Sequence, residues 1–118
     1  MRLVTRGDLD GLTCAVLLKE MDMIDEIKFV HPKDMQDGKI VMRPSDIMTN
    51  LPYVDGCYLV FDYHESETVR LGARRPENHI IDPKAPSAAR VLFNHFGGVA
   101  KFHRISLEMM EAVDKSDS

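Results

Sequence analysis

Two acidic residues flanked by glycine follow the first short apolar run of the chain, in Gly7-Asp8-Leu9-Asp10-Gly11. Alternate residues of an extended segment point the same way, so Asp8 and Asp10 can face one site. Carboxylate oxygens are the ligands that Mg²⁺ and Mn²⁺ prefer. The other interpretation, a turn in which one Asp caps the following helix, stays open on these residues alone.

A second candidate is the apolar run that ends in Asp62-Tyr63-His64. A carboxylate beside an imidazole, at the end of a strand, suits Mn²⁺ or a bound phosphate. The alternative is an ordinary surface or hydrogen-bonded histidine. The segment therefore predicts a ligand site or a simple strand end.

Two further segments are candidates for phosphate binding or for metal binding. In IIDPKAPSAA, a strand, a proline-stiffened turn and a helix start would bring free backbone N–H groups, the Ser87 hydroxyl and Lys84 together as a phosphate site. Ordinary helix capping is the alternative. The last segment, AVDKSDS, contains Asp114 and Asp117 and by itself resembles a solvated tail.

The elements that must position these residues alternate between short β-branched runs and helical patterns. We predict strands over residues 2–5, 26–30, 39–42, 57–61 and 79–81, with helices over about 11–23, 88–96 and 107–113. Ser87 and Ser106 are the expected caps of the last two helices. This order predicts an α/β fold of three layers, with a mostly parallel central sheet of about five strands flanked by helices.

In such a sheet, ligands bind beyond the carboxyl ends of the strands. Asp8 and Asp10 follow the first predicted strand, Asp46 the third, Asp62 the fourth and Asp82 the fifth, so we expect these acids at one edge. Like charges about 4 Å apart repel by several kcal/mol at an effective dielectric constant near 20. The acids are therefore either spread out or accompanied by metal ions.

Composition limits the class of protein. The chain has 118 residues, of which 44% are hydrophobic and 29% charged, as in one globular domain. A net charge of -4 argues against general nucleic-acid coating. No run is long enough to span a membrane and the first residues do not resemble a signal peptide, so we expect a cytoplasmic protein. Cys14 and Cys57 are expected to be free thiols.

The acidic segments, in this order, resemble those of the DHH phosphoesterases, particularly the exopolyphosphatase-related branch. Asp8 and Asp10 match the family's first motif, and Asp46 in SDIMTNLPY is similar to the second. FDYHES resembles the Asp-His-His motif, IIDPKAPSAARV the stretch that follows it, and AVDKSDS the fourth motif, with Asp117 or Asp114 as its acid. The similarity extends over nearly the whole chain.

The resemblance implies a hydrolase with two metal ions, usually Mn²⁺ and otherwise Mg²⁺. On that template Asp46 would bridge the ions, Asp8 would bind one ion, and Asp10 and Asp117 the other. Asp114 is the alternative to Asp117.

The resemblance also assigns residues to the substrate. His64 would contact its phosphate and Asp62 would orient the neighbouring groups, while Lys84 and Ser87 remain candidate phosphate contacts. The substrate class would be a phosphate-containing small molecule, a short polyphosphate or an oligonucleotide, and a homodimer is possible.

The chain departs from the family pattern in three ways. Arg6 stands where the family has a histidine, so it is a candidate catalytic residue through its charge alone, because a guanidinium has no lone pair for a metal. Tyr63 replaces a ligand histidine and would coordinate only as phenolate. Finally, the family continues into a second domain, whereas residues 1–118 read as a single DHH-type catalytic domain.

The leading interpretation is metal-dependent hydrolysis of phosphoanhydride or phosphodiester bonds. The alternative is a degenerate relative that binds a nucleotide or phosphate without hydrolysis, with Arg6 replacing a lost metal. Less favoured are a haloacid-dehalogenase-like phosphatase, suggested by Asp8-Leu9-Asp10-Gly11-Leu12-Thr13, and an adaptor domain.

Overall fold

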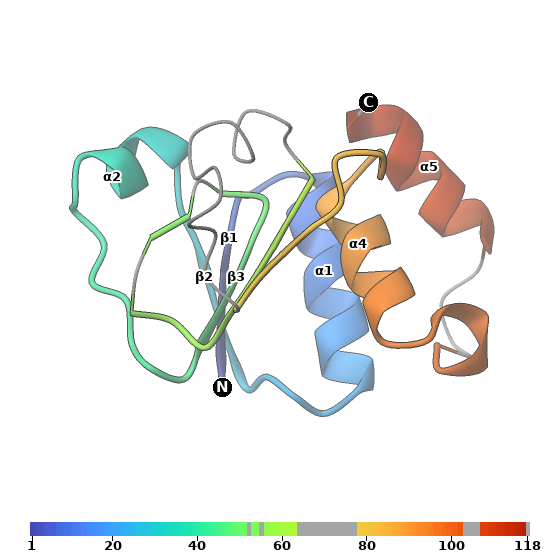
Figure 1. Cartoon of the computed structure of the whole chain (residues 1–118), viewed down its shortest axis with the longest axis horizontal. Coiled ribbons are helices and arrows are strands. Elements are labelled where there is room, and N and C mark those ends of the chain that lie inside the picture. Colours follow the sequence, from blue (N-terminus) through green and yellow to red (C-terminus); the bar gives the residue numbers. More distant parts are fainter. Residues whose placement is uncertain (52, 55, 64–77, 103–106, 118) are drawn as a thin grey trace.

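The structure is a computed structural model that describes residues 1–51, 53–54, 56–63, 78–102 and 107–117; for residues 107 and 117 it describes only the backbone. Its elements are shown in Figure 1. In chain order they are β1 (Arg2–Thr5), α1 (Leu9–Glu20), β2 (Glu26–Phe29), α2 (Pro32–Gln36), β3 (Asp46–Thr49), β4 (Leu59–Asp62), β5 (His79–Ile81), α4 (Ala88–His95), the 3₁₀ helix η2 (Gly98–Ala100) and α5 (Leu107–Asp117).

Within the described residues, five strands form one sheet in the order β2-β1-β3-β4-β5, and every neighbouring pair is parallel. Arg2 of β1 is in register with Glu26 of β2 and with Asp46 of β3. The predicted α/β fold with a five-stranded sheet is confirmed, and the sheet is parallel throughout. All carboxyl ends therefore lie at one edge.

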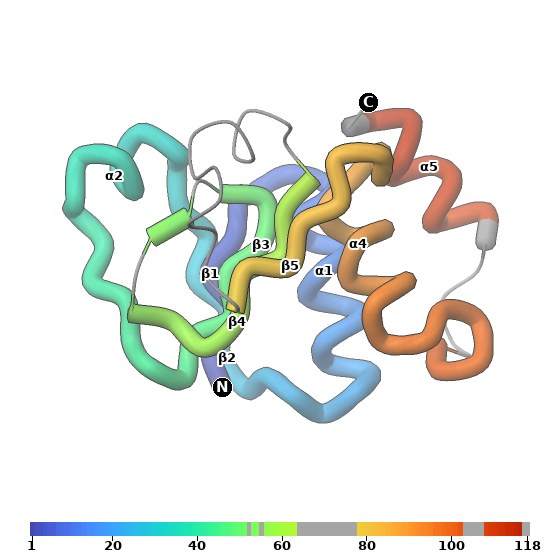
Figure 2. The backbone as a smooth tube through the Cα atoms, in the orientation of Figure 1, coloured from blue at the N-terminus to red at the C-terminus, as the bar shows by residue number. Residues whose placement is uncertain are grey.

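Helices cover both faces of the sheet, as the chain trace in Figure 2 shows. Successive strand residues point to opposite faces, so Leu3 and Val4 of β1 belong to different core clusters. Leu3 packs with residues of α1, α4 and α5, including Leu17 and Met110. Val4 packs with Met35 of α2 in a smaller cluster. In the described part of the chain, α1, α4 and α5 thus lie on one face of the sheet and the short α2 on the other.

The third strand is displaced from its predicted position. The prediction over residues 39–42 was wrong, because this segment is outside the sheet and Val41 is 81% exposed. Residues Asp46–Thr49 form β3 instead, and all four are buried. A central parallel strand is covered on both faces, so it cannot have the exposure of residues 39–42. The five-residue helix α2 was not predicted.

The helices follow the sequence signals more closely. Ser87 caps α4 and its hydroxyl accepts a hydrogen bond from the Arg90 N–H, as predicted. The first helix begins at Leu9, two residues before its predicted start. A Cβ on Gly11 would lie 2.0 Å from the carbonyl oxygen of Arg6, so only glycine allows the end of β1 to pass this close to α1. The proposed cap Ser106 lies outside the described residues.

Candidate active site

The connections that leave β1 and β3 go to opposite faces of the sheet. After β1 the chain enters α1, whose Cys14 and Leu17 pack in the larger cluster, whereas after β3 Leu51 packs in the smaller one. Neighbouring strands whose connections diverge in this way mark the ligand position of open α/β sheets, outside their carboxyl ends. The topology therefore places the candidate site between the ends of β1 and β3.

Asp8 lies at this position and remains partly accessible. It caps α1, and its Oδ1 accepts a hydrogen bond of 2.8 Å from the Gly11 N–H. Its side chain is 34% exposed and lines an open hollow of about 470 Å³ with Gly7, Leu9, Leu12 and Phe29. The Arg6 guanidinium is close to it, with Nε 3.8 Å from Asp8 Oδ2. Capping uses one oxygen, so the carboxylate can still bind a ligand.

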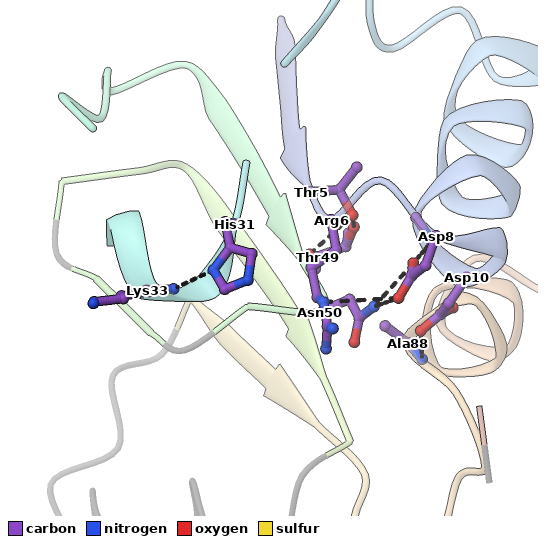
Figure 3. Close-up of polar contacts among 10 residues, drawn as sticks. Thr5, Arg6, Asp8, Asp10, His31, Lys33, Thr49, Asn50 and Ala88 are labelled. Carbon is purple, nitrogen blue, oxygen red and sulfur yellow. Dashed lines mark hydrogen bonds and ion pairs between the residues drawn. The ribbon is translucent and has the colours of Figure 1, made fainter. Parts of the chain in front are cut away.

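Asn50 faces Asp8 from the end of β3. Its amide nitrogen Nδ2 lies 3.1 Å from Oδ2 and 3.3 Å from Oδ1 of Asp8 (Figure 3). The residue is buried, and its Oδ1 accepts no hydrogen bond from the described part of the chain. A buried carbonyl oxygen without a donor is costly unless a ligand satisfies it. Asn50 is therefore a candidate ligand-binding residue at this edge.

Sequence reasoning missed Asn50 because it placed the third strand too early. The residue has a positive φ of 59°, a conformation that Asn tolerates better than most residues. An Asn directly after a buried strand was the signal that could have identified it. In the DHH pattern an Asp follows the middle strand, so Asn50 is a fourth departure and removes one negative charge from the site.

Two buried threonines join the ends of β1 and β3 beneath this pair. Thr49 Oγ1 donates to Thr5 Oγ1 over 2.9 Å, and Thr5 Oγ1 donates to the Thr49 carbonyl oxygen over 3.1 Å. Both side chains are fully buried, so the bonds are shielded from water. They fix the spacing of the two strand ends that present Asp8 and Asn50.

Asp10 is positioned differently from Asp8. It lies in the first turn of α1 rather than in an extended segment, and it is buried. Its Oδ2 accepts from the Ala88 N–H over 3.0 Å and its Oδ1 from the Ala89 N–H over 2.7 Å (Figure 3). The carboxylate thus occupies the N-terminus of α4, where we had expected a phosphate. The metal role of Asp10 stays a prediction.

Asp46 is at the opposite edge of the sheet, and its predicted place after the third strand was wrong. It is the first residue of β3, fully buried, and accepts from Arg2 Nε over 2.9 Å and from Arg2 Nη2 over 2.6 Å. The Arg43 N–H also donates to it over 2.8 Å. This hydrogen bonding raises the pKa of the Arg2 guanidinium. Asp46 is an ion-pair partner far from Asp8 along the strands and cannot bridge metals there.

Ser87 and Asp114 connect α4 to α5. The buried Ser87 hydroxyl accepts from the Arg90 N–H and donates to Asp114 Oδ1 over 2.8 Å. Asp114 Oδ2 accepts from Arg90 Nε over 3.0 Å and from Nη2 over 2.7 Å. Ser87 thus donates one hydrogen bond and accepts another within the chain, and a guanidinium neutralises Asp114. The predicted substrate role of Ser87 and metal role of Asp114 stay predictions.

The remaining predicted residues are placed only in part. Asp62 ends β4 at the carboxyl edge, buried, with Oδ1 accepting from the Tyr63 N–H over 2.8 Å. Tyr63 is partly buried and packs against the larger core cluster. The Lys84 N–H donates to Asp82 Oδ1, and both lie in the turn before α4. His64 and the side chain of Asp117 lie outside the described residues, so their predicted roles stay predictions.

A site for Mg²⁺ or Mn²⁺ needs several oxygen ligands around one point. Among the described residues no three His, Cys, Asp or Glu side chains gather around one point. Asp8 and Asn50 do supply a carboxylate and an unsatisfied amide oxygen from neighbouring side chains, with Asn50 Nδ2 facing the carboxylate. Oxygen donors of these two kinds suit hard divalent cations. The pair fits as part of a metal site, to which other ligands would have to be added.

Comparison with known proteins identifies the family. No family model and no curated protein sequence matches the chain. A solved structure does: PggH, a pGpG-specific phosphodiesterase from Vibrio cholerae, is 58% identical over 98% of this chain with a TM-score of 0.88. PggH is a DHH-family member. This chain belongs to the DHH phosphoesterase family.

The DHH assignment confirms the resemblance seen in the sequence and overturns the haloacid-dehalogenase-like interpretation. The matched region is 36% of the PggH chain, so this DHH chain spans about a third of that protein. In the described parts of the chain, no helix combines the length and the apolar character needed to cross a membrane.

Proposed function

We propose that this DHH domain takes part in the hydrolysis of phosphodiester bonds, with a short linear dinucleotide as the substrate class. The observation that carries the proposal is the 58% identity to a pGpG-specific phosphodiesterase over 98% of the chain. The position of Asp8 and Asn50 at the carboxyl edge of a parallel sheet supports it, since ligands bind there in this class of fold. Phosphoanhydride hydrolysis, which the sequence left open, has no comparable support.

We propose Asp8 and Asn50 as the residues that would hold a divalent cation, Mn²⁺ or Mg²⁺. The Asp8 carboxylate has a partly exposed oxygen, and Asn50 Oδ1 has no donor in the described part of the chain. Such an ion supplies an activated water and neutralises charge on the phosphoryl group when it is bound. Asp10, His64 and Asp117 remain the predicted further ligands or substrate contacts, and a second ion depends on them.

The chain's own side chains have separate tasks in this proposal. Arg6 lies close enough to Asp8 to bring positive charge to a bound phosphate, and its exposed side chain can adjust to the substrate. Asn50 Nδ2 holds the orientation of the Asp8 carboxylate. The Thr5–Thr49 contact keeps the two strand ends at a fixed distance. Precise placement of this kind is what positions a substrate for attack.

A second candidate function is binding of the same nucleotide without hydrolysis. Two observations favour it: Asn50 stands where the family pattern has an Asp, and Arg6 lies 3.8 Å from Asp8, where a cation would otherwise sit. With fewer carboxylates and a permanent positive charge, the site would attract phosphate without needing a metal. This candidate predicts nucleotide affinity that does not depend on Mn²⁺.

Hydrolysis of pGpG by the purified protein in the presence of Mn²⁺, compared with Asp8→Asn, tests the proposal. Asn is as good a helix cap as Asp, so the variant should fold while losing the carboxylate. We expect kcat/KM to fall at least about 100-fold. Asp25→Asn is the matched control, because Asp25 is an 88% exposed acid whose one ion pair among the described residues is with the terminal amine. Equal turnover by Asp8→Asn and the control would exclude this site.

We also propose that the protein is cytoplasmic. Cys14 and Cys57 are free thiols, and a reducing compartment preserves such thiols.

A further inference from the structure

His31 lies at the same edge of the sheet as Asp8, on the opposite face. It follows β2, whose last paired residue Phe29 is in register with Thr5, and the Val30 N–H donates to the Thr5 carbonyl oxygen over 2.8 Å. His31 then begins α2, which packs on the face opposite to α1 through Met35. The site between the diverging connections is thus bordered by the start of α1 on one side and by His31 on the other.

In the view of Figure 3, Arg6 and Asn50 lie between the His31 ring on one side and Asp8 on the other. The imidazole belongs to an exposed residue, in contrast to Asn50, so a ligand can reach it from solvent. His31 lies between the segments that resemble the first and second family motifs and belongs to neither of them.

The hydrogen bond to Lys33 determines which nitrogen of His31 carries the proton. Nδ1 accepts from the Lys33 N–H over 3.1 Å and so caps α2. An accepting Nδ1 has no hydrogen of its own, so in this arrangement the ring hydrogen is on Nε2. The Nε2–H group is consequently a hydrogen-bond donor.

The cap limits what His31 can do while it is in place. The lone pair on Nδ1 is occupied by the Lys33 N–H and Nε2 carries a hydrogen, so the ring has no lone pair to give to a metal ion. The role that this arrangement favours is to donate a hydrogen bond from Nε2.

We propose that His31 is a substrate-binding residue whose Nε2–H donates to a phosphate oxygen of the nucleotide. This inference rests on the proposed function, because it takes the substrate to be a phosphodiester bound at the edge where Asp8 and Asn50 lie. A hydrogen bond to a charged oxygen is among the stronger ones in proteins. It would hold the phosphate from the side opposite to α1.

Two substitutions separate this role from simple helix capping. His31→Asn keeps an acceptor at the Nδ1 position and therefore the cap, but has no group that reaches as far as Nε2. His31→Gln keeps an N–H donor near the Nε2 position and is a poor cap. The dissociation constant for pGpG and the KM should rise about 10-fold or more in His31→Asn, with Tm and kcat nearly unchanged. In His31→Gln, Tm should fall while the affinity stays within about 3-fold.

The opposite order would overturn the inference. If His31 only caps α2, pGpG affinity will follow Tm, and His31→Asn will bind like the wild type. Should the wild-type protein bind pGpG without turning it over, the proposed hydrolysis fails while the ratio of dissociation constants still decides the role of His31. A protein that neither binds nor hydrolyses pGpG would overturn both proposals.

Discussion

The two edges of the sheet each contain an aspartate next to an arginine, and the two pairs differ in almost every respect. At the amino edge, Asp46 and Arg2 form two hydrogen bonds of 2.6 and 2.9 Å and are both buried. At the carboxyl edge, Arg6 Nε is 3.8 Å from Asp8, and the two side chains are 43% and 34% exposed. A closed pair has its hydrogen-bonding capacity filled, whereas an open pair can exchange one partner for a ligand. The closed pair therefore stabilises the fold, and we propose the open pair for ligand binding.

The largest effect should come from breaking the closed pair. Asp46→Ala leaves the buried Arg2 guanidinium without its partner, so the free energy of unfolding should fall by about 3 to 5 kcal/mol. Urea denaturation followed by circular dichroism measures it. Asp25→Ala, which removes an exposed ion pair, should change stability by no more than about 0.5 kcal/mol. A loss below about 1 kcal/mol in Asp46→Ala would remove the contrast between the edges.

An intermediate loss of stability is expected at Asp10. This residue is buried and hydrogen-bonded like Asp46, and it is a predicted metal ligand like Asp8. Asp10→Asn keeps the shape but turns one acceptor into a donor facing an N–H of α4, which should cost about 1 to 3 kcal/mol. Urea denaturation measures this loss of stability. Turnover of pGpG at a temperature where the variant is folded measures the effect on activity. If turnover falls 100-fold or more in folded protein, Asp10 also binds the metal as predicted from the sequence.

The smallest expected change in function sharpens the comparison at the open edge. Asn50→Asp restores the acid of the family pattern and places a second carboxylate beside Asp8, at a cost of several kcal/mol in metal-free protein. Affinity for Mn²⁺ should rise about 10-fold, since an added anionic oxygen ligand strengthens binding of a hard cation. Calorimetric titration with Mn²⁺ provides the measurement. Unchanged affinity would mean that position 50 lies outside the metal site.

Much of the fold could be predicted because the relevant signals are local. The strand at Arg2–Thr5, the cap at Ser87 and the free thiols follow from residue type and neighbouring sequence alone. The third strand could not be placed this way: residues 39–42 are as apolar in pattern as 46–49, and only burial by α2 and the neighbouring strands distinguishes them. Tertiary packing, and not local sequence, therefore determines that residues 46–49 and not 39–42 form the strand.

That displacement explains the errors at the site. When the strand moves to Asp46–Thr49, Asp46 passes from the carboxyl to the amino edge and Asn50 takes its expected place. Likewise, the helix start at Ala88 was predicted as a phosphate site or an ordinary cap, and in the structure the chain's own Asp10 accepts hydrogen bonds from its N–H groups. Sequence patterns indicate that a carboxylate is available; they do not indicate which internal donors it already serves.

Anomalous scattering from crystals of the protein soaked in Mn²⁺ tests the central claim most directly. We predict a manganese peak at the carboxyl edge, in contact with the Asp8 carboxylate and the Asn50 amide oxygen, and no peak at Asp46. Manganese bound only away from Asp8 and Asn50, or absent from the carboxyl edge at saturating concentration, would contradict the account.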